Sequence, residues 1–304
     1  MRNILVVAIL SAGVTVVAHS QSGPASTMAN GPLQVELETR LVRELDHLAS
    51  SLDGVAGYIV TDLTTNTRVA ARLEREPFPT ASAIKLSVLY ELLKQAEAGT
   101  LHLDTPTAVK RGDLAGGSGV LQHLGSPSLS LRDHATLMIM VSDNSSTNIV
   151  INAVGMDQVN ARMTALGLGD IRLRRLMMDA AAVTRGDENV ASPQSLAKSA
   201  ELLWKGEGLT SASRDTALRM LALVSGSIRR GVPSAVPVFA KTGGLDGVVT
   251  EAGVVAVAGR PFSIAVMTTY LTNSEEGSRV VREMTAAAWR YFDRLAKGGA
   301  YGRK

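Results

Sequence analysis

Hydrophobic residues repeat with a helical period at both ends of the chain and through its middle. Between residues 33 and 52, leucines recur every three or four positions with charged residues between them. This period is typical of an amphipathic helix that packs one face on a core. The same period returns at residues 82–94, 131–141, 193–204, 213–223 and 280–295. Ser130 and Ser192 stand directly before two of these segments, where they predict helix N-caps.

Segments typical of β-strands flank this helical middle on both sides. Residues 57–62 and 68–72 are separated by the turn sequence Thr64-Thr65-Asn66, which predicts a β-hairpin. Three more strand-like runs come late in the chain, at residues 236–240, 248–257 and 262–268. We therefore predict an α/β (α+β) fold, in which a five-stranded antiparallel sheet with flanking N- and C-terminal helices joins an all-helical lobe. Residues 32–80 and 225–300 would form the sheet lobe and residues 81–224 the helical lobe, together one domain.

The first 20 residues have the pattern of a signal peptide. A positive start is followed by an apolar run and by the small residues of Ala18-His19-Ser20, so we predict cleavage after Ser20. An uncleaved membrane anchor is the alternative. Residues 21–31 are small and polar and would form a linker. No later apolar run is long enough to span a bilayer, so we expect an exported protein, periplasmic or secreted, without stable membrane insertion after signal removal.

Composition narrows the possible partners. The chain has no cysteine, a formal net charge of +3 and only 4% aromatic residues. The core must therefore hold the fold without disulfides, and no basic tract with interleaved aromatics suggests nucleic-acid binding. The 5 histidines are isolated in the sequence, so we predict no metal site and no cofactor. Among them, His134 is interpreted as a packed or surface residue.

A serine and a lysine three residues apart, Ser82 and Lys85, begin one of the predicted helices. Positions i and i+3 share one helix face, so the hydroxyl and the amine can point the same way. A serine hydroxyl is a weak nucleophile unless a base lies within hydrogen-bond reach. A lysine amine can be that base when burial and nearby positive charge lower its pKa. By itself the pair could equally be an ordinary helix start with a solvated lysine.

Two more polar clusters follow in order, Ser142-Asp143-Asn144 and Lys241-Thr242-Gly243. Alone, the first could be a polar turn at a helix end, and Lys241 could be an edge-strand charge. Together with Ser82-x-x-Lys85, the chain resembles the serine penicillin-recognising superfamily, specifically the class A β-lactamases. Residues 117–122 and 131–133 also look like that family, and the resemblance covers most of the mature chain. It implies a β-lactamase/transpeptidase-like fold and acyl-enzyme chemistry.

The resemblance also implies a role for each catalytic residue. Ser82 would be the nucleophile that attacks an amide carbonyl, and Lys85 would be its base, directly or through water. Ser142 would carry a proton to the leaving nitrogen. The backbone N–H groups of Ser82 and Gly244 would form the oxyanion hole.

The same resemblance implies the substrate-binding residues. Asn144 would hold Lys85 and the side-chain amide of the substrate. Lys241 would supply positive charge for the substrate carboxylate and tune Ser142, and Thr242 would hydrogen-bond that carboxylate. Gly243 and Gly244 would let the backbone approach a ligand closely. No arginine is obvious on the strand after Lys241, so a further carboxylate partner is not assigned.

One loop departs from the class A pattern, which has a water-activating glutamate in a Glu-x-x-x-Asn arrangement. Across residues 172–189, Met177 stands at the glutamate position and Ala181 at the asparagine position. A thioether cannot activate water. Asp179, two residues further on, is the candidate deacylation residue. Asp187 and Glu188 are interpreted as salt-bridge partners within the loop, with Arg174 or Arg175.

These features predict a class A β-lactamase-like serine hydrolase, acylated at Ser82 by β-lactams and hydrolysing them slowly. Two alternatives remain open. One is a penicillin-binding D-alanyl-D-alanine peptidase, and the other is a β-lactam sensor that stays acylated. The expected partner is a small molecule, a β-lactam or a D-Ala-D-Ala-like peptide, and we expect a monomer.

Overall fold

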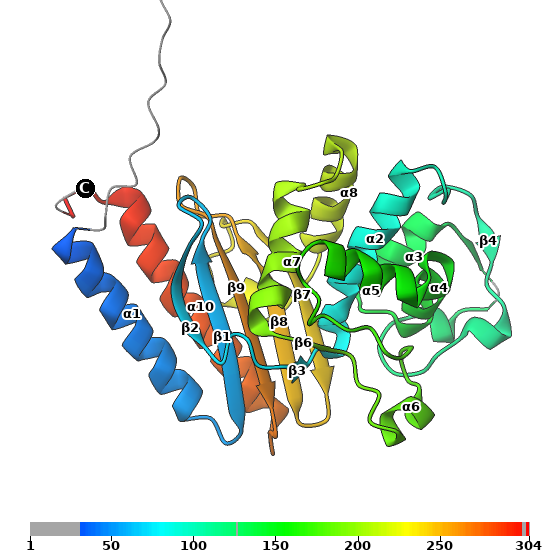
Figure 1. Cartoon of the computed structure of the whole chain (residues 1–304), viewed down its shortest axis with the longest axis horizontal. Coiled ribbons are helices and arrows are strands. Elements are labelled where there is room, and N and C mark those ends of the chain that lie inside the picture. Colours follow the sequence, from blue (N-terminus) through cyan, green and yellow to red (C-terminus); the bar gives the residue numbers. More distant parts are fainter. Residues whose placement is uncertain (1–30, 126, 300–301, 304) are drawn as a thin grey trace, which may run out of the picture.

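The computed structural model describes residues 31–125, 127–299 and 302–303. The predicted signal peptide and all but the last residue of the predicted linker lie outside these residues. The main sheet has five antiparallel strands in the order β2-β1-β9-β8-β7 (Figure 1). The strands are β1 Val55–Asp62, β2 Thr67–Arg72, β7 Val238–Leu245, β8 Val248–Val255 and β9 Phe262–Thr269. The predicted five-stranded antiparallel sheet is confirmed.

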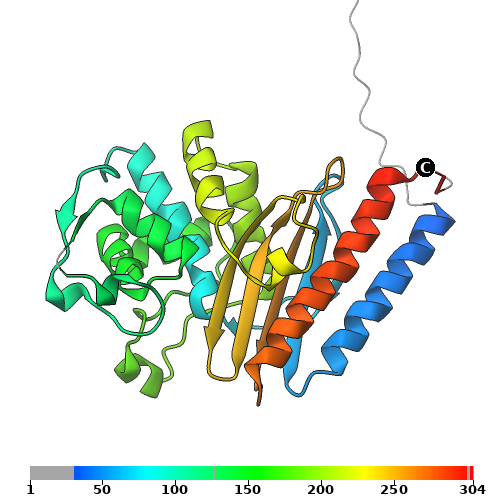
Figure 2. The ribbon, with the colours of Figure 1, turned by 180° about the vertical axis from the view of Figure 1, so that it is seen from behind.

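Two long helices cover one face of this sheet. Helix α1 spans Pro32–Ser50 and α10 spans Ser274–Lys297, and they lie side by side (Figure 2). Their apolar sides pack on the inward side chains of the strands, and Phe292 of α10 stacks on Phe262 of β9 with ring centroids 4.5 Å apart. Such aromatic contacts stabilise a core beyond the area they bury.

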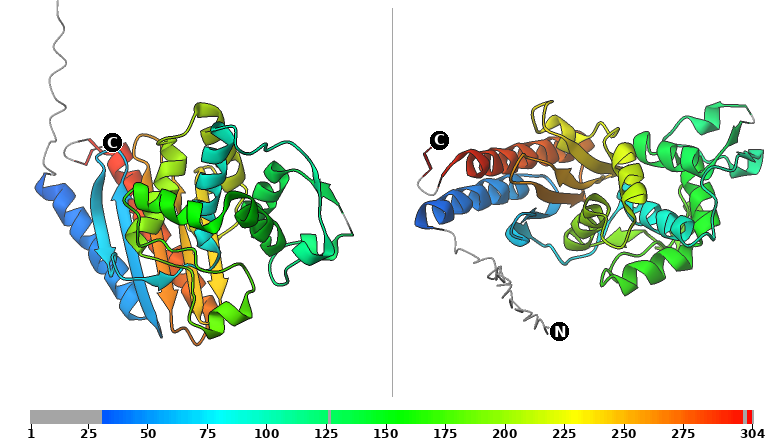
Figure 3. Two further views of the ribbon diagram at one scale, coloured as in Figure 1. Left: turned by 45° about the vertical axis from the view of Figure 1, so that its right-hand side comes forward. Right: turned by 90° about the horizontal axis from the view of Figure 1, so that it is seen from above.

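Most of the remaining helices lie against the other face and beyond the β7 edge (Figures 1 and 3). The exception is α9, Ser227–Arg230, which packs against α10 and contributes Ile228 to the core on that side. Helix α7, Pro193–Lys205, packs directly on β1, β8 and β9. Alternate strand residues serve the two cores, since Ile59 faces the helical side while Tyr58 and Val60 face α1 and α10. The other helices are α2 Lys85–Glu97, α3 Leu131–Met140, α4 Asn144–Val154, α5 Met156–Ala165, α6 Ala180–Thr184, α8 Ser211–Leu221 and α9 Ser227–Arg230.

Short elements complete the chain between β2 and β7. Among the residues described there, three 3₁₀ turns occur, η1 Ala81–Ile84, η2 Arg111–Asp113 and η3 Leu121–His123. Two-residue strands pair as β3 Phe78–Pro79 with β6 Val190–Ala191, and as β4 Thr107–Ala108 with β5 Ser128–Leu129. The segment 81–224 therefore contains three short strands besides its helices.

The predicted helix starts can be compared with the observed caps. Ser130 forms a capping box with Asp133, and Ser192 accepts a hydrogen bond from the Ser195 amide with Pro193 at the first helical position, so both predictions are confirmed. The helix expected from residue 213 begins instead at Ser211, because Thr210 accepts from the Ser213 amide and caps it.

Two expectations about the ends of elements are corrected. The first helix ends at Ser50, before residue 52. Lys241, expected at the end of a strand, lies inside β7, which continues to Leu245 because the β7–β8 pairing extends to Val248. His134 is 2% exposed and lies 3.1 Å from the Ser146 hydroxyl, which confirms a packed histidine. In the described part of the chain, none of the helices combines the length and apolarity that crossing a bilayer requires.

Candidate active site

Ser82 lies where the helical part of the chain meets the edge strand β7. It belongs to η1, which leads directly into the buried helix α2. The Thr250 hydroxyl donates a hydrogen bond to the Thr80 carbonyl at 2.7 Å, and a Cβ on Gly243 would lie only 2.6 Å from that carbonyl oxygen. Gly243 thus allows η1 to pack against the sheet. Ala81, just before the serine, has a φ of 46°, a strained value for a residue with a side chain.

Two buried lysine amines converge on the Ser142 hydroxyl. Lys85 Nζ lies 3.0 Å from Ser142 Oγ, 2.9 Å from the Ser142 carbonyl oxygen and 3.2 Å from Asn144 Oδ1. Lys241 Nζ approaches the same hydroxyl from β7 at 3.2 Å and donates to the Thr242 carbonyl at 2.8 Å. Both lysines are 0% exposed. The fold therefore brings together residues from all three sequence motifs.

Asp143 fixes the turn that carries Ser142. Its carboxylate caps α4 by accepting from the Ser146 amide at 2.8 Å, and it also accepts from the Val120 and Leu121 amides, each at 2.7 Å. Gly119 must be a glycine here, because a Cβ would lie 2.3 Å from the Asp143 carboxylate and its φ is 105°. Ser142 itself has a φ of 57°. The carboxylate thus holds a strained turn in place between α3 and α4.

Burial lowers the pKa of both amines, and the neighbouring charges act differently on the two. Burial lowers the pKa of Lys85 well below its usual value, and the charge of Lys241 lowers it further. Burial also lowers the pKa of Lys241 to about 7, although the nearby Glu251 carboxylate opposes this shift. A neutral Lys85 has two hydrogens and a lone pair. It can therefore donate to the Ser142 carbonyl and Asn144 while accepting the Ser142 hydroxyl hydrogen.

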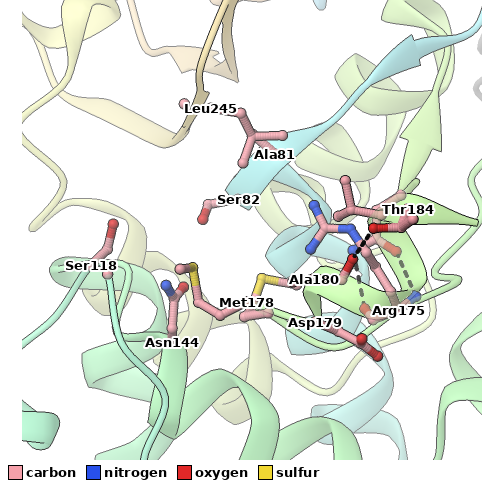
Figure 4. Close-up of a pocket in the computed structure, with 15 residues that line it drawn as sticks. Ala81, Ser82, Ser118, Asn144, Arg175, Met178, Asp179, Ala180, Thr184 and Leu245 are labelled. Atoms are coloured by element: carbon pink, nitrogen blue, oxygen red, sulfur yellow. Dashed lines mark hydrogen bonds between the residues drawn. The ribbon is translucent and has the colours of Figure 1, made fainter. Parts of the chain in front are cut away.

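The Ser82 hydroxyl is not hydrogen-bonded to Lys85. All three hydrogen bonds of the Lys85 amine involve Ser142 and Asn144, and within the described residues Ser82 Oγ has no hydrogen-bond partner. Figure 4 shows the Ser82 side chain beside an open cavity. The structure therefore places the expected nucleophile and base on adjoining turns, with the direct contact made between the base and Ser142.

A cavity of about 550 Å³ borders Ser82 on one side (Figure 4). Its lining is largely apolar, with Met177, Met178, Val183 and Leu245 among the contributing side chains. Such a surface is suited to binding an apolar group of a ligand beside Ser82. A second cavity of about 350 Å³ lies on the β7 side and is lined by Ser82, Ser142, Thr242 and Gly243, among others.

The loop that contains Met177 is closed by polar contacts. Arg172 pairs with Val190, and Arg175 forms a 2.7 Å ion pair with Glu188, which confirms the expected role of that glutamate. The expected pairing of Asp187 with Arg174 or Arg175 is wrong, because Asp187 contacts Arg185 at 3.0 Å on the adjacent exposed turn.

Asn148 of α4 fixes the register of the loop at Met177. Its side-chain oxygen accepts from the Met177 amide at 2.8 Å, and its nitrogen donates to the Met177 carbonyl at 3.1 Å. Met177 is 7% exposed and lines the larger cavity, whereas Met178 has a φ of 63° and is 58% exposed. The position clamped beside the cavity thus carries a thioether.

Asp179 is the N-cap of α6. Its Oδ1 accepts from the Ala182 amide at 2.9 Å, and Figure 4 shows the carboxylate pointing away from Ser82. Ala181, expected at the position of an asparagine, lies on the exposed side of α6. Asp179 is among the residues that line the larger cavity, but its carboxylate is engaged as the cap of α6.

Two polar residues of the site were not found from the sequence. Arg230, at the end of α9, lines the β7-side cavity together with Ser142 and Thr242. Glu251, on β8, is 2% exposed, and burial raises its pKa to about 7. A charged residue within the apolar run 248–257 was the available signal for Glu251. Arg230 comes from a different element from the strand on which an arginine was sought. Among the described residues, no three acidic or histidine side chains are arranged to bind a metal ion.

Comparison with known proteins gives consistent matches. The sequence model of the Beta-lactamase enzyme family matches residues 40–292. An imipenem-hydrolysing β-lactamase of Enterobacter cloacae is 28% identical over 243 residues, which cover 77% of this chain and 83% of that protein.

Solved structures agree with the sequence matches. A β-lactamase of Sphaerobacter thermophilus superposes with a TM-score of 0.76 at 28% identity, covering 82% of this chain and 96% of its own. PBP-A superposes with a TM-score of 0.77 at 25% identity, covering 84% and 97% respectively. A PBP-A mutant solved as an acyl-enzyme complex with penicillin G gives the same values.

The Asn148 clamp generates a testable prediction. Asn148→Ala removes both side-chain hydrogen bonds to the Met177 backbone, and should destabilise the local loop structure by about 1–3 kcal/mol. Amide hydrogen exchange at Met177 should accelerate accordingly. Asn160→Ala is the matched control, because Asn160 makes the same pair of bonds to the Leu173 backbone, away from the cavity. Unchanged exchange at Met177 in Asn148→Ala would show that other contacts hold the loop.

Proposed function

The chain belongs to the β-lactamase enzyme family and is a β-lactamase-like serine hydrolase, and from this premise we propose that it works by class A chemistry, with β-lactams as substrates. In this proposal β-lactams acylate Ser82, and the enzyme hydrolyses the β-lactam amide slowly. The supporting observation is the convergence of two buried lysine amines on the Ser142 hydroxyl. One of the two, Lys85, lies one turn after Ser82 in the chain. We further propose export through the predicted signal peptide, with a role in β-lactam resistance.

Acylation would proceed by proton transfers among these groups. Ser82 Oγ forms a bond to the amide carbonyl carbon, and its proton passes to neutral Lys85, directly or through water. The carbon–nitrogen bond then breaks, and the nitrogen receives a proton from Ser142, which regains one from Lys85. The 3.0 Å contact between Lys85 and Ser142 supports this route, because it already joins the base to the proton carrier. The N–H groups of Ser82 and Gly244 would stabilise the developing oxyanion.

The substrate carboxylate would bind on the β7 side. Lys241 contributes positive charge, and Thr242 a hydroxyl that lines the smaller cavity. Arg230 lines the same cavity, so we propose it as the additional cationic partner. Asn144 would orient the amide of the substrate side chain while holding Lys85. An apolar side-chain group would occupy the larger cavity beside Met177 and Leu245.

Deacylation would be slow because the clamped loop position lacks a carboxylate. Met177 cannot take a proton from water, and the Asp179 carboxylate is engaged as the α6 cap. A general base contributes about 10²–10⁴-fold to such a step, so its absence prolongs the acyl-enzyme. The missing base also favours a second candidate, a penicillin-binding D-alanyl-D-alanine peptidase. The likeness to PBP-A adds support, since its TM-score is 0.77 against 0.76 for the β-lactamase of Sphaerobacter thermophilus. A sensor that stays acylated is the limiting case without turnover.

We predict that benzylpenicillin adds its full mass to the protein, because ring opening leaves every atom of the drug attached to Ser82. Intact-mass spectrometry over time should show this adduct in the native protein and no adduct in Ser82→Ala. Slow decay of the adduct indicates a hydrolase, and a permanent adduct indicates a sensor. An adduct of the same size in Ser82→Ala would mean that another residue is the nucleophile.

Acylation should also depend on pH through Lys85. Its pKa lies well below the ordinary lysine value, so the amine is neutral above that lowered pKa and becomes a charged ammonium below it. Only the neutral form can accept the Ser82 proton, so the acylation rate should fall as pH decreases through the Lys85 pKa. Lys85→Arg stays charged throughout and should be acylated very slowly at every pH. A wild-type acylation rate in Lys85→Arg would assign the base role to another group.

We predict burst kinetics with a chromogenic cephalosporin: one rapid equivalent followed by a low steady-state rate. Met177→Glu should raise the steady-state rate by as much as about 10²-fold, because it restores a carboxylate at the clamped position. Asp179→Asn is the control, since asparagine also caps helices well and should leave the steady state unchanged. Loss of turnover in Asp179→Asn would show that Asp179 activates the water, contrary to its capping role.

A further inference from the structure

Glu251 is a buried carboxylate that the proposed chemistry does not use. It lies on β8, paired across the sheet with Thr242 of β7, and is 2% exposed. Its Oε2 accepts from the Ser227 amide at 2.8 Å, and its Oε1 accepts from the Ile228 amide at 3.1 Å. Both amides belong to the first turn of α9, which packs against α10, β7 and β8. The Glu251 side chain therefore links strand β8 to the first turn of α9.

The fit between these elements leaves no room for adjustment. A Cβ on Gly226, the residue before α9, would lie 2.1 Å from Glu251 Oε1 and 2.5 Å from Thr242 Cγ2. The backbone of Gly226 has a φ of −105°, which any residue can adopt, so close contact accounts for the glycine. The start of α9 thus packs closely against the Glu251 carboxylate and against Thr242, which lines the β7-side cavity.

The same short helix carries Arg230. This residue lies at the end of α9, three positions after Ser227, and its guanidinium donates to the Ser227 hydroxyl at 3.1 Å. Arg230 and Glu251 both line the cavity that also contains Ser142 and Thr242. A helix of four residues has little rigidity of its own, so the position of Arg230 depends on what holds the first turn.

A carboxylate is a costly residue for this role. An apolar side chain between β8 and α9 would avoid the desolvation of a charge. Glu251 is instead retained with two amide donors, and Lys241 and Arg230 are the cationic groups that stabilise its negative form. What the carboxylate adds over apolar packing is direction, because two hydrogen bonds fix how α9 meets the sheet.

We propose that Glu251 is a positioning residue for substrate recognition, which clamps the first turn of α9 and thereby holds Arg230 toward the carboxylate of the substrate. The proposal rests on the proposed function for the identity of the ligand. It assigns Glu251 no contact with substrate. Removing the clamp should therefore weaken binding of carboxylate-bearing substrates and leave the acylation chemistry at Ser82 intact.

The test compares acylation by benzylpenicillin with acylation by its methyl ester, which lacks the carboxylate. Glu251→Gln keeps the size of the side chain but offers an acceptor to only one of the two amides. It should raise the concentration for half-maximal acylation by benzylpenicillin about tenfold with little change in the maximal rate, which is the signature of lost ground-state binding. The methyl ester should lose much less than benzylpenicillin does, because any effect of Glu251→Gln on the neighbouring Lys241 amine acts on both substrates alike.

Four further variants separate positioning from general stability. Arg230→Ala should have the same selective effect, and Glu251→Gln should add nothing in the Arg230→Ala background, since both remove one coupled interaction. Gly226→Ala should act like Glu251→Gln by displacing α9 while leaving the carboxylate in place. Glu201→Gln is the matched control, because Glu201 is another buried glutamate, bonded to Ser263 within α7 and β9, and should leave both substrates unaffected.

Hydrogen exchange in the same proteins tests the clamp without substrate. The Ser227 and Ile228 amides should exchange faster in Glu251→Gln than in the native protein. Unchanged exchange, equal losses with penicillin and its ester, or additive effects of Glu251→Gln and Arg230→Ala would each overturn the proposal. A native protein that penicillin does not acylate would overturn the proposed function and the ligand assigned to Arg230, while hydrogen exchange would still decide whether Glu251 clamps α9.

Discussion

The placement of two lysine amines inside the protein, both within hydrogen-bond reach of one serine hydroxyl, is the constraint on which the site depends. An ammonium buried in this way loses its hydration, and a second one nearby adds repulsion. Burial and the charge of Lys241 therefore favour a neutral Lys85, whereas the Glu251 carboxylate favours the charged form of Lys241. The surrounding structure therefore favours the neutral form of Lys85, which is the form the proposed base role requires. The hydroxyl between the amines links them.

The fold meets this constraint by building the site at a seam. Lys85 begins α2, Ser142 lies in the turn between α3 and α4, and Lys241 lies in the edge strand β7. Ala81, Ser142 and Met178 all have positive φ values and border the same region. Such strain persists only where the surroundings impose it, and here carboxylate and amide side chains do so. Asp143 fixes the turn, Asn148 fixes the loop and Glu251 fixes α9.

The sequence alone predicts the elements whose local signals agree with the tertiary structure. The hairpin, the late strands and the caps Ser130 and Ser192 follow from periodicity and from side chains that bond their own turn. The prediction that Ser82, Lys85, Ser142 and Lys241 share one site came from the family resemblance of the three motifs. The distances between the motifs along the sequence do not by themselves predict that they meet in space. Asp179 shows that a local sequence signal can also be misinterpreted. The sequence marked it as a candidate base, yet the alanine-rich turn that follows makes it a helix cap.

The remaining features depend on contacts between distant segments. No local pattern predicts that Lys85 bonds Ser142 rather than Ser82, or that Arg230 enters the site from a four-residue helix. From the sequence alone, Glu251 is an unexplained charge in an apolar strand. The structure explains it through the hydrogen bonds from the Ser227 and Ile228 amides of α9. These contacts also have a functional consequence. Under the proposed function, the enzyme would form an acyl intermediate readily and release it slowly, because Met177 places a thioether where turnover needs a base.

The protonation state of Lys85 tests this account most directly. Selective ¹³C labelling of the lysine ε-carbons, with the Lys85 signal assigned by its loss in Lys85→Arg, would follow the titration of this amine by NMR in the intact protein. The account predicts that the Lys85 amine loses its proton well below the ordinary lysine pKa of about 10.4. A Lys85 signal that keeps the chemical shift of an ammonium until pH rises toward that ordinary value would contradict it.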